Sequence, residues 1–317
     1  MEEILAMEHI TKTYPGVKAL DDVSISFIQG EVHAVMGENG AGKSTLMKIL
    51  NGMIPADGGE IRFHGEKVAI RNPRDARALG IAMIHQELNP IKDLTVAENM
   101  FVGRYPQKGC FVDWSTMYDE CRKLFEHWKV DFDPKQKVRT LSTAETQMLE
   151  ILKAISYDAK LIIMDEPTVA VDPQSRNRIL EGILELNRQG STIIYTSHYM
   201  EEVEQICSRI AIIDHGHVLA TGTCEELKNM IKTGETITIE AINLNPETLS
   251  EIRTMPNVFE LTYEEQVLKI RLSGGKHNLI SLLKYLGDHN ISFGRVFSEL
   301  PTLNDVFLEI TGKELRD

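Results

Sequence analysis

The sequence predicts an α/β fold in which a parallel core sheet is covered by helices, followed by a small α+β module. Short apolar strands alternate with helical segments over most of the chain, an order typical of a parallel sheet buried on both faces. A glycine-rich loop at residues 37–44 joins one such strand to a helix. Beyond residue 236 the order becomes β-α-β-β-α-β, that of a ferredoxin-like module.

The first part of the chain is expected to be one domain of residues 1–232. Residues 1–10 and 23–28 alternate in polarity as strands, on either side of the turn Tyr14-Pro15-Gly16. Further strands are expected at residues 31–36, 58–63, 68–70, 81–85, 161–164 and 192–195, with a hairpin over 209–221. Helical spacing begins near residue 46, runs through a helical subdomain at about 87–157 and returns at 174–188.

The second part is expected to be an accessory domain of residues 236–317. Its strands are predicted at residues 236–242, 258–262, 267–272 and 291–297, and its helices at 246–253 and 278–286. A last helix is expected to begin at a cap on Thr302. The module shows no pattern that carries chemistry, and its acidic residues are interpreted as a solvated surface.

Composition limits the classes of partner. The chain has 317 residues, a net charge of −13 and four cysteines without a C-x-x-C pair. The negative charge argues against nucleic acid or an anionic lipid surface as the main partner, since both require a basic face. The longest apolar runs are much shorter than the roughly 18 residues that a membrane span needs, and the acidic N-terminus is unlike a signal peptide. We expect a cytosolic protein that does not insert into the membrane and reaches it only through a partner.

The glycine-rich loop has the spacing G-x-x-x-x-G-K-S of a phosphate-binding loop. Gly37, Gly40 and Gly42 would let backbone N–H groups turn inward, and the N-terminus of the following helix favours an anion. Lys43 would reach the β- and γ-phosphates, and Ser44 would help to hold Mg²⁺. The alternative is an ordinary glycine turn. Eight residues that meet both the pattern and the strand–helix context favour binding of a nucleoside triphosphate.

An acidic pair follows a later apolar strand. Asp165 and Glu166 are expected at the carboxyl end of that strand, which is the ligand edge of an α/β sheet. Asp165 would support Mg²⁺, and Glu166 would act as general base toward the attacking water. Such pairs are common by chance. Their weight here comes from their position downstream of the phosphate-binding loop.

Three single residues gain meaning only from the rest of the set. Gln86 ends a strand and could bind Mg²⁺ or the water, although alone it reads as a surface turn residue. His198 also ends a strand and could contact the γ-phosphate, although a lone histidine there more often caps a loop. Tyr14 could stack on a base or simply pack.

A capping box lies between the phosphate-binding loop and the acidic pair. Ser142 and Glu145 have S-x-x-E spacing before an amphipathic segment, so Ser142 is expected to cap a helix whose N-terminus can face an anion. The alternative is a well-capped helix and nothing more.

In this order the motifs resemble those of the ATP-binding subunit of ABC transporters, over about residues 4–227. Tyr14 stands at the adenine-stacking position, and the Walker A loop comprises Gly37, Asn39, Gly40, Ala41, Gly42, Lys43, Ser44 and Thr45. Gln86 stands at the Q-loop, and the signature motif includes Ser142 and Ala144. Asp165 and Glu166 stand at the Walker B motif, Asp172 at the D-loop and His198 at the switch histidine. The resemblance implies that Glu166, His198 and Gln86 serve catalysis, and that Ser44, Gln86 and Asp165 serve Mg²⁺.

The resemblance also implies partners. Two such subunits, identical or different, would enclose two ATP molecules, with the signature motif of one facing the Walker A loop of the other. Hydrolysis would drive a membrane-spanning transporter subunit, on which residues 87–157 would dock. The chain would then lie in the cytoplasm, at the inner face of the cell membrane.

One departure from the family pattern concerns the signature motif. The usual sequence is Leu-Ser-Gly-Gly-Gln, whereas Thr143, Ala144 and Glu145 fill the last three positions here. The side chains of Thr143 and Ala144 stand where backbone must approach phosphate closely. Glu145 puts an acid near an anionic ligand, so it is expected to weaken closure of the dimer unless its capping role holds it away.

The chain resembles two different branches of the family. Up to about residue 165 it is similar to monosaccharide-importer ATPases, and from about 167 onward to drug- and antibiotic-exporter ATPases. This suggests a recombinant, natural or constructed, with its seam in residues 164–168. The first half of the chain contains the docking segment 87–157 and favours sugar-type import. The accessory domain of residues 236–317 favours export.

Other functions remain as alternatives. A GTPase would need an Asn-Lys-x-Asp motif, which the sequence lacks. A non-transport ATPase of the same superfamily, or a nucleotide switch that does not hydrolyse, would share the phosphate-binding loop. Glu166 and His198 favour hydrolysis over the switch.

Overall fold

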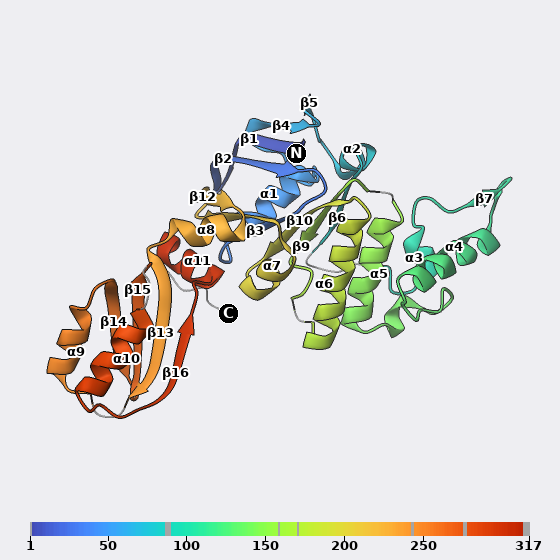
Figure 1. The fold of residues 1–317 in the computed structure, drawn as a ribbon. Helices are drawn as coiled ribbons and strands as arrows, with labels where there is room; N and C mark the ends of the chain where they lie inside the picture. Colours follow the sequence, from blue (N-terminus) through green and yellow to red (C-terminus); the bar gives the residue numbers. More distant parts are fainter. Residues whose placement is uncertain are drawn as a thin grey trace. The chain divides into compact units, whose positions relative to one another are not determined.

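The computed structural model describes residues 2–85, 90–157, 159–169, 171–241, 244–274 and 278–312. The chain divides into two compact units, Met1–Thr221 and Gly222–Asp317 (Figure 1). Each unit has a buried apolar core.

The first unit is built on a six-stranded sheet with the order β12-β11-β3-β10-β9-β6. Its strands are β3 (Val32–Met36), β6 (Ile81–Ile84), β9 (Leu161–Asp165), β10 (Thr192–Ser197), β11 (Arg209–Asp214) and β12 (His217–Gly222). The five strands from β11 to β6 pair in parallel. Every residue of β3, β9 and β10 is buried, as expected of strands covered on both faces. The predicted parallel core is confirmed.

A second, antiparallel sheet has the order β2-β1-β4-β5. It contains β1 (Glu3–Tyr14), β2 (Val17–Ile28), β4 (Gly58–Phe63) and β5 (Glu66–Val68). Helix α1 (Lys43–Leu50) lies between the two sheets and contacts β2 and β9 (Figure 1). One apolar core joins the three elements, with Phe27, Leu46 and Ile163 among its members. The helix that follows the phosphate-binding loop is therefore held firmly from both sides.

The first two strands are longer than the sequence predicted. They pair up to the turn, where Thr13 faces Lys18 and Tyr14 faces Val17. Several register shifts interrupt the alternation of polarity along this pair, which explains why the pattern ended early. The backbone ladder holds these polar residues in the sheet without help from burial.

The remaining α-helices of the first unit are α2 (Pro73–Ala78), α3 (Val96–Met100), α4 (Trp114–His127), α5 (Thr143–Ile155), α6 (Pro173–Arg188) and α7 (Met200–Ile206), with a 3₁₀ turn at Val138–Thr140. These α-helices begin at side-chain caps, except α7, whose N-cap residue Tyr199 makes no capping hydrogen bond through its side chain. The region predicted as helical also contains a small hairpin of β7 (Gln107–Lys108) and β8 (Phe111–Val112). On α4 the predicted apolar face is buried at Met117, Cys121 and Phe125. Helices α5 and α6 pack side by side (Figure 1).

The second unit has the predicted strand–helix order. It contains β13 (Thr233–Ala241), α9 (Pro246–Arg253), β14 (Val258–Glu264), β15 (Val267–Ser273), α10 (Asn278–Asp288) and β16 (Phe293–Glu299). The strands form an antiparallel sheet with the order β14-β15-β13-β16. The predicted cap on Thr302 begins the last helix, α11 (Leu303–Thr311).

A short helix, α8 (Cys224–Met230), opens the second unit and was not predicted. It packs against α11, and Glu309 of α11 accepts hydrogen bonds from the backbone N–H of Lys232 (2.7 Å) and the hydroxyl of Thr233 (3.1 Å). These contacts hold residues 222–232 to the second unit, so the boundary between the compact units falls earlier than the expected break at residues 232–236.

Candidate nucleotide-binding site

The loop between β3 and α1 has a shape that requires glycine. A Cβ at Gly37 would lie 2.2 Å from the carbonyl oxygen of Ile213, and one at Gly42 would lie 2.6 Å from that of Ala19. Gly42 also has φ +111°, which side chains rarely adopt, and forms the N-cap of α1. The loop thus presents the positive end of a helix in a cradle with no side chains at these two points, which suits a phosphate.

The remaining loop residues follow this course. Ala41 is buried, and its carbonyl accepts a hydrogen bond of 3.0 Å from the N–H of Gly216 in the β11–β12 turn. Asn39 is exposed and Thr45 half-buried at the first turn of α1. The loop is therefore anchored to the edge of the parallel sheet.

The Lys43 amine is buried inside the loop. Its Nζ donates to the carbonyls of Gly37 (2.8 Å) and Glu38 (3.2 Å). It also lies 3.5 Å from Oε1 of Glu166, a buried ion pair. The lysine that follows the glycines and the acid that ends β9 therefore meet in one place.

Ser44 and Asp165 also meet. The Ser44 hydroxyl donates to Oδ1 of Asp165 at 3.2 Å, and the Thr196 hydroxyl donates to the same oxygen at 2.7 Å. A hydroxyl and a carboxylate oxygen side by side suit Mg²⁺, which is commonly bound by one or two protein groups together with substrate phosphates and water. In keeping with so sparse a set, the described residues contain no cluster of three or more His, Cys, Asp or Glu able to hold a metal.

Thr196 is a site residue that sequence reasoning missed. Its hydroxyl accepts a hydrogen bond of 2.9 Å from the N–H of Glu166 while donating to Asp165. Both acids are thereby fixed from the neighbouring strand β10. The available signal was a hydroxyl two residues before His198, at the end of a buried strand.

Glu166 has an unusual backbone. Its φ is +48°, in the left-handed region that favours glycine, and its side chain is buried. The Nδ1 of His198 lies 3.6 Å from Oε1 of Glu166. Within the described part of the chain, this nitrogen is buried without a hydrogen-bond partner. The histidine is thus available to bond a group that enters beside Glu166.

A second buried cluster supports these strand ends. Oε2 of Glu202, on α7, accepts hydrogen bonds from the hydroxyls of Thr168 (2.8 Å), Ser197 (3.2 Å) and Tyr195. Arg176 of α6 places its Nε 3.2 Å from Oε1 of Glu202. Burial, and then the charge of Glu202, raises the pKa of Tyr195 far above its ordinary value. The phenol stays protonated and keeps donating, which ties β10 to the segment after β9.

Two further predicted residues, Asp172 and Tyr14, lie at a helix end and at a strand end. Oδ1 of Asp172 accepts from the N–H of Ser175 (3.0 Å) and caps α6, and hydrogen bonds from Ser175 lower the pKa of this carboxyl. Tyr14 ends β1 with 38% of its surface exposed, as a stacking residue must. Gln86 lies outside the described residues.

The signature segment forms the predicted capping box. The N–H of Glu145 donates to the Ser142 hydroxyl at 3.2 Å, and the N–H of Ser142 donates to Oε2 of Glu145 at 2.7 Å. Ala144 lies in the first turn of α5, between these two residues. The acid of this unusual signature is therefore directed back onto its own helix.

Comparison with known proteins defines the class. The sequence profile described as "ABC transporter" matches residues 20–169. A crystal structure of a nucleotide-free ATP-binding cassette from an ABC transporter is 30% identical with a TM-score of 0.64, and the match covers 72% of this chain and 94% of that one. A dimeric cassette bound to ADP and Pi is 22% identical with a TM-score of 0.61, covering 69% and 98%, and supports the fold alone.

The fold and the loop thus define a P-loop α/β nucleotide-binding protein. Within that class the chain belongs to the ATP-binding cassette family of ABC transporters.

Its relatives include galactose/methyl galactoside import ATP-binding proteins MglA. Those of Sodalis glossinidius (strain morsitans) and Salmonella typhimurium are 46% and 45% identical over 226 residues, covering 71% of this chain and 45% of each relative. The chain therefore spans about half the length of these relatives. No helix among the described residues has the length and apolar character to cross a bilayer.

The second unit matches a different profile. The "ATP-binding protein DrrA1-3-like, C-terminal domain" matches residues 222–311. This match begins where the second compact unit begins. The alignment with the importer relative spans 226 residues of this chain, so it continues past the predicted seam at residues 164–168. The hybrid character is supported, and a seam at residues 164–168 stays a prediction.

Proposed function

We propose that this chain is the ATP-binding and ATP-hydrolysing subunit of an ABC transporter. The observation that carries the proposal is the convergence of two pairs at one edge of the parallel sheet. Lys43 lies beside Glu166, and Ser44 lies beside Asp165. These pairs join the phosphate-binding loop to the acids that hydrolysis requires.

Each residue has a role that follows from its position. The loop amides and the N-terminus of α1 would bind the phosphates of ATP, and Lys43 would turn its amine from the loop carbonyls to the γ-phosphate. Ser44 and Asp165, with Gln86 as a further predicted ligand, would hold Mg²⁺, which supplies positive charge to offset that of the phosphates. Tyr14 would stack on the adenine.

Hydrolysis itself would depend on Glu166. Its carboxylate, fixed through the backbone by Thr196, would take the proton of the attacking water. His198 would donate from its ring to the γ-phosphate, which would satisfy a nitrogen within 3.6 Å of Glu166. A switch that binds ATP without hydrolysis would not need this acid.

The decisive experiment is Glu166→Gln. The amide keeps the size of the side chain but cannot accept the proton, so MgATP turnover is expected to fall by at least about 100-fold. ATP binding, measured with a fluorescent analogue, should remain.

The matched control is Glu181→Gln, an exposed acid on α6, which should leave turnover unchanged. Turnover that survives Glu166→Gln would assign the base to another residue. Absent turnover in the unchanged protein, with ATP still bound, would favour the nucleotide switch.

We further propose that two subunits enclose ATP together. Ser142 and Ala144 of one subunit would face the phosphate-binding loop of the other. In the described residues, the side-chain hydrogen bonds at the N-terminus of α5 stay within its own first turn, and none reaches the phosphate-binding loop of the same chain. Dimerisation by MgATP is then required for hydrolysis. It is measured by size-exclusion chromatography of the Glu166→Gln protein with and without MgATP, and a monomer in both would contradict it.

We propose that a membrane-spanning subunit docks on the first unit. A cavity of about 230 Å³ lies between α2, β6 and α5, and Arg77, His85 and Tyr157 are among its lining residues. It would accept a segment of a membrane-spanning subunit, which would keep this chain in the cytoplasm at the inner face of the membrane. The names of the MglA relatives favour sugar import, whereas the resemblance of the sequence from about residue 167 onward to exporter ATPases favours a drug exporter.

Co-purification with the membrane protein encoded beside this chain would test the docking. ATPase activity of the reconstituted complex would then be measured with galactose on either side. Stimulation by galactose supports sugar import, and its absence together with stimulation by an amphipathic drug supports export.

A further inference from the structure

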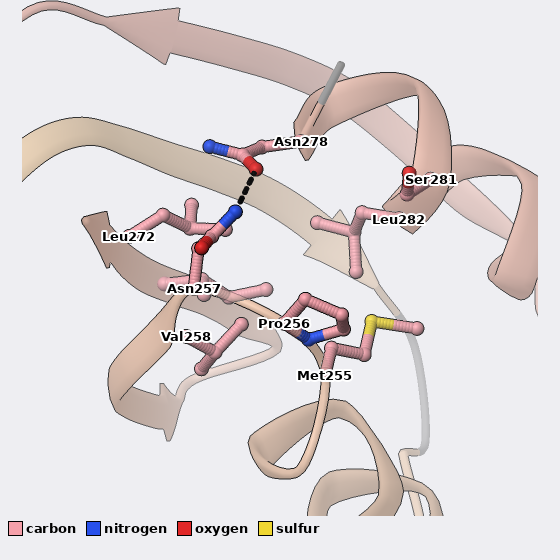
Figure 2. A pocket seen from close by; sticks show the side chains of 9 residues that line it. Met255, Pro256, Asn257, Val258, Leu272, Asn278, Ser281 and Leu282 are labelled. Carbon is pink, nitrogen blue, oxygen red and sulfur yellow. Dashed lines mark hydrogen bonds between the residues drawn. The ribbon is translucent and has the colours of Figure 1, made fainter. Parts of the chain in front are cut away.

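The second unit contains a cavity that ATP hydrolysis does not explain. Its volume is about 200 Å³, and it lies between the turn after α9, strand β15 and the start of α10 (Figure 2). Nine of the described residues line it, namely Met255, Pro256, Asn257, Val258, Ile270, Leu272, Asn278, Ser281 and Leu282.

The inner wall of the cavity is apolar. Ile270, Leu272 and Leu282 are buried members of the core of this unit, and Met255 and Val258 pack against that core. A ligand that enters would therefore exchange water for hydrocarbon contact, which favours an apolar body.

The rim of the cavity is polar and exposed at Asn257 and Ser281. The carboxamide of Asn257 donates through Nδ2 to Oδ1 of Asn278 at 3.0 Å (Figure 2). Asn278 in turn donates through Nδ2 to Oε2 of Glu235 at 3.2 Å. Among the described residues, no donor bonds the carbonyl oxygen of the Asn257 side chain, so this oxygen can accept a hydrogen bond from a ligand.

The acceptor is held in place. Asn257 has φ +69°, a conformation that asparagine tolerates better than most residues. Its backbone carbonyl accepts from the N–H of Ser273 at 2.8 Å, which fixes it to β15. With the bond to Asn278, both ends of this residue are anchored, so little freedom is lost when a ligand binds.

The lining selects against charge. None of the nine lining residues that the structure describes carries a charged or titratable side chain. An ion would lose its hydration without gaining an opposite charge, and Glu235 behind Asn278 would repel an anion further.

We propose that this cavity binds a neutral, largely apolar small molecule that carries one hydrogen-bond donor. Its apolar body lies against Ile270, Leu272 and Leu282, and its donor bonds the side-chain oxygen of Asn257. The cavity is smaller than the ~300–1,000 Å³ of typical drug-binding pockets, which limits the ligand to about one ring or a short branched chain. This site is independent of the proposed ATPase function.

The test uses benzamide as the probe and the full chain with labelled Ile and Leu methyl groups. Saturable NMR shifts are expected at Ile270, Leu272 and Leu282, with a Kd on the order of millimolar, as for any ligand this small. Acetophenone, which has the same shape without the N–H donor, and benzoate, which is charged, are each expected to bind at least about 5-fold more weakly. Absent or non-saturating shifts would overturn the site, and equal binding of benzoate would overturn its preference for a neutral ligand.

Two matched variants locate the binding. Ser281→Trp should close the mouth and remove the shifts, whereas Ile280→Trp, on the same helix at a position 62% exposed and outside the lining, should leave them. Asn257→Gly removes the carboxamide without opposing φ +69° and should make benzamide and acetophenone bind alike. Shifts that persist in Ser281→Trp would overturn the location. If that variant does not fold, the three probes on the unchanged chain still decide the proposal.

Discussion

At the scale of single residues, Thr196 determines how the two acids of the candidate site stand. Its hydroxyl accepts a hydrogen bond from the N–H of Glu166 and donates one to Asp165. Thr196 is fully buried. A buried hydroxyl that serves two partners is difficult to replace, because its loss leaves polar groups without their bonds.

Thr196→Val is therefore expected to slow MgATP hydrolysis by about 10- to 100-fold and to lower the free energy of unfolding by about 1–3 kcal/mol. Valine has the shape of threonine without the hydroxyl. Thr196→Ser keeps the hydroxyl and should retain most of the activity. The measurements are steady-state ATPase rates and urea unfolding. Full activity in the valine variant would show that Thr196 does not position the acids.

His33, in the strand before the phosphate-binding loop, predicts a dependence of stability on pH. Its Nε2 accepts the N–H of Ile28 at 2.7 Å, which requires an unprotonated nitrogen. Burial lowers the pKa of His33 below its ordinary value of 6.5. The Ile28 carbonyl and Glu31 raise this pKa by smaller amounts, and the charge of Arg209 lowers it slightly further. Below about pH 6.5 the unfolded chain binds a proton on this ring that the folded chain does not.

Stability should then be complete above pH 6.5 and fall as the pH drops, by at most about 1.4 kcal/mol per pH unit from this residue. Urea unfolding of the wild-type protein and of His33→Gln at pH 7.5 and pH 5.5 measures it. The variant should lose less stability between the two values. Equal losses would exclude His33 as the cause.

At the scale of elements, the caps of α5 and α6 show that helix starts near the site are set locally. Ser142 and Glu145 bond each other across the first turn of α5, and Asp172 caps α6. Such caps are typically worth about 1 kcal/mol. They keep the signature segment and the D-loop at fixed helix ends.

Glu145→Gln is expected to tighten the MgATP-driven dimer several-fold. Glutamine keeps the S-x-x-Q capping pattern, and the change removes a negative charge from the helix N-terminus that would face a phosphate. The elution volume on a sizing column with MgATP, in the Glu166→Gln background, measures the effect. Unchanged dimerisation would mean that the cap already holds the charge away.

Elements and motifs of short range were predictable from the sequence, and relations across the sheet were not. The phosphate-binding loop, the capping box and the cap at Thr302 depend on residues a few positions apart, so their spacing predicts them. The role of Thr196 depends on β10 lying beside β9, which no local pattern states. Helix α8 was missed because only one of its residues, Leu227, is buried, which leaves little apolar periodicity.

At the scale of the whole molecule, the described residues include two apolar clusters, one in each unit, that share no residue. One joins the two sheets of the first unit through α1, and the other lies under the sheet of the second unit. A ligand bound to one core element should stabilise the unit that contains it.

Calorimetry of the Glu166→Gln protein is therefore expected to show two transitions, only one of which responds to MgATP. At a concentration of 100 times Kd the stabilisation is about 2.7 kcal/mol. For a unit of this size the transition should move up by about 5–10 °C. A single transition, or equal movement of both, would show that the units unfold together.

Glu166, the proposed general base, has a backbone conformation that lowers the stability of the folded chain. A non-glycine residue at its φ of +48° costs about 1–3 kcal/mol, and here it also crowds a carboxylate into a buried space. Glycine or asparagine at this position would relieve the strain and remove the proposed base in one change. The same change would leave the buried amine of Lys43, 3.5 Å away, without its carboxylate, so the strain at position 166 is tied to the ion pair that joins the loop to this acid and cannot be removed without losing that pair.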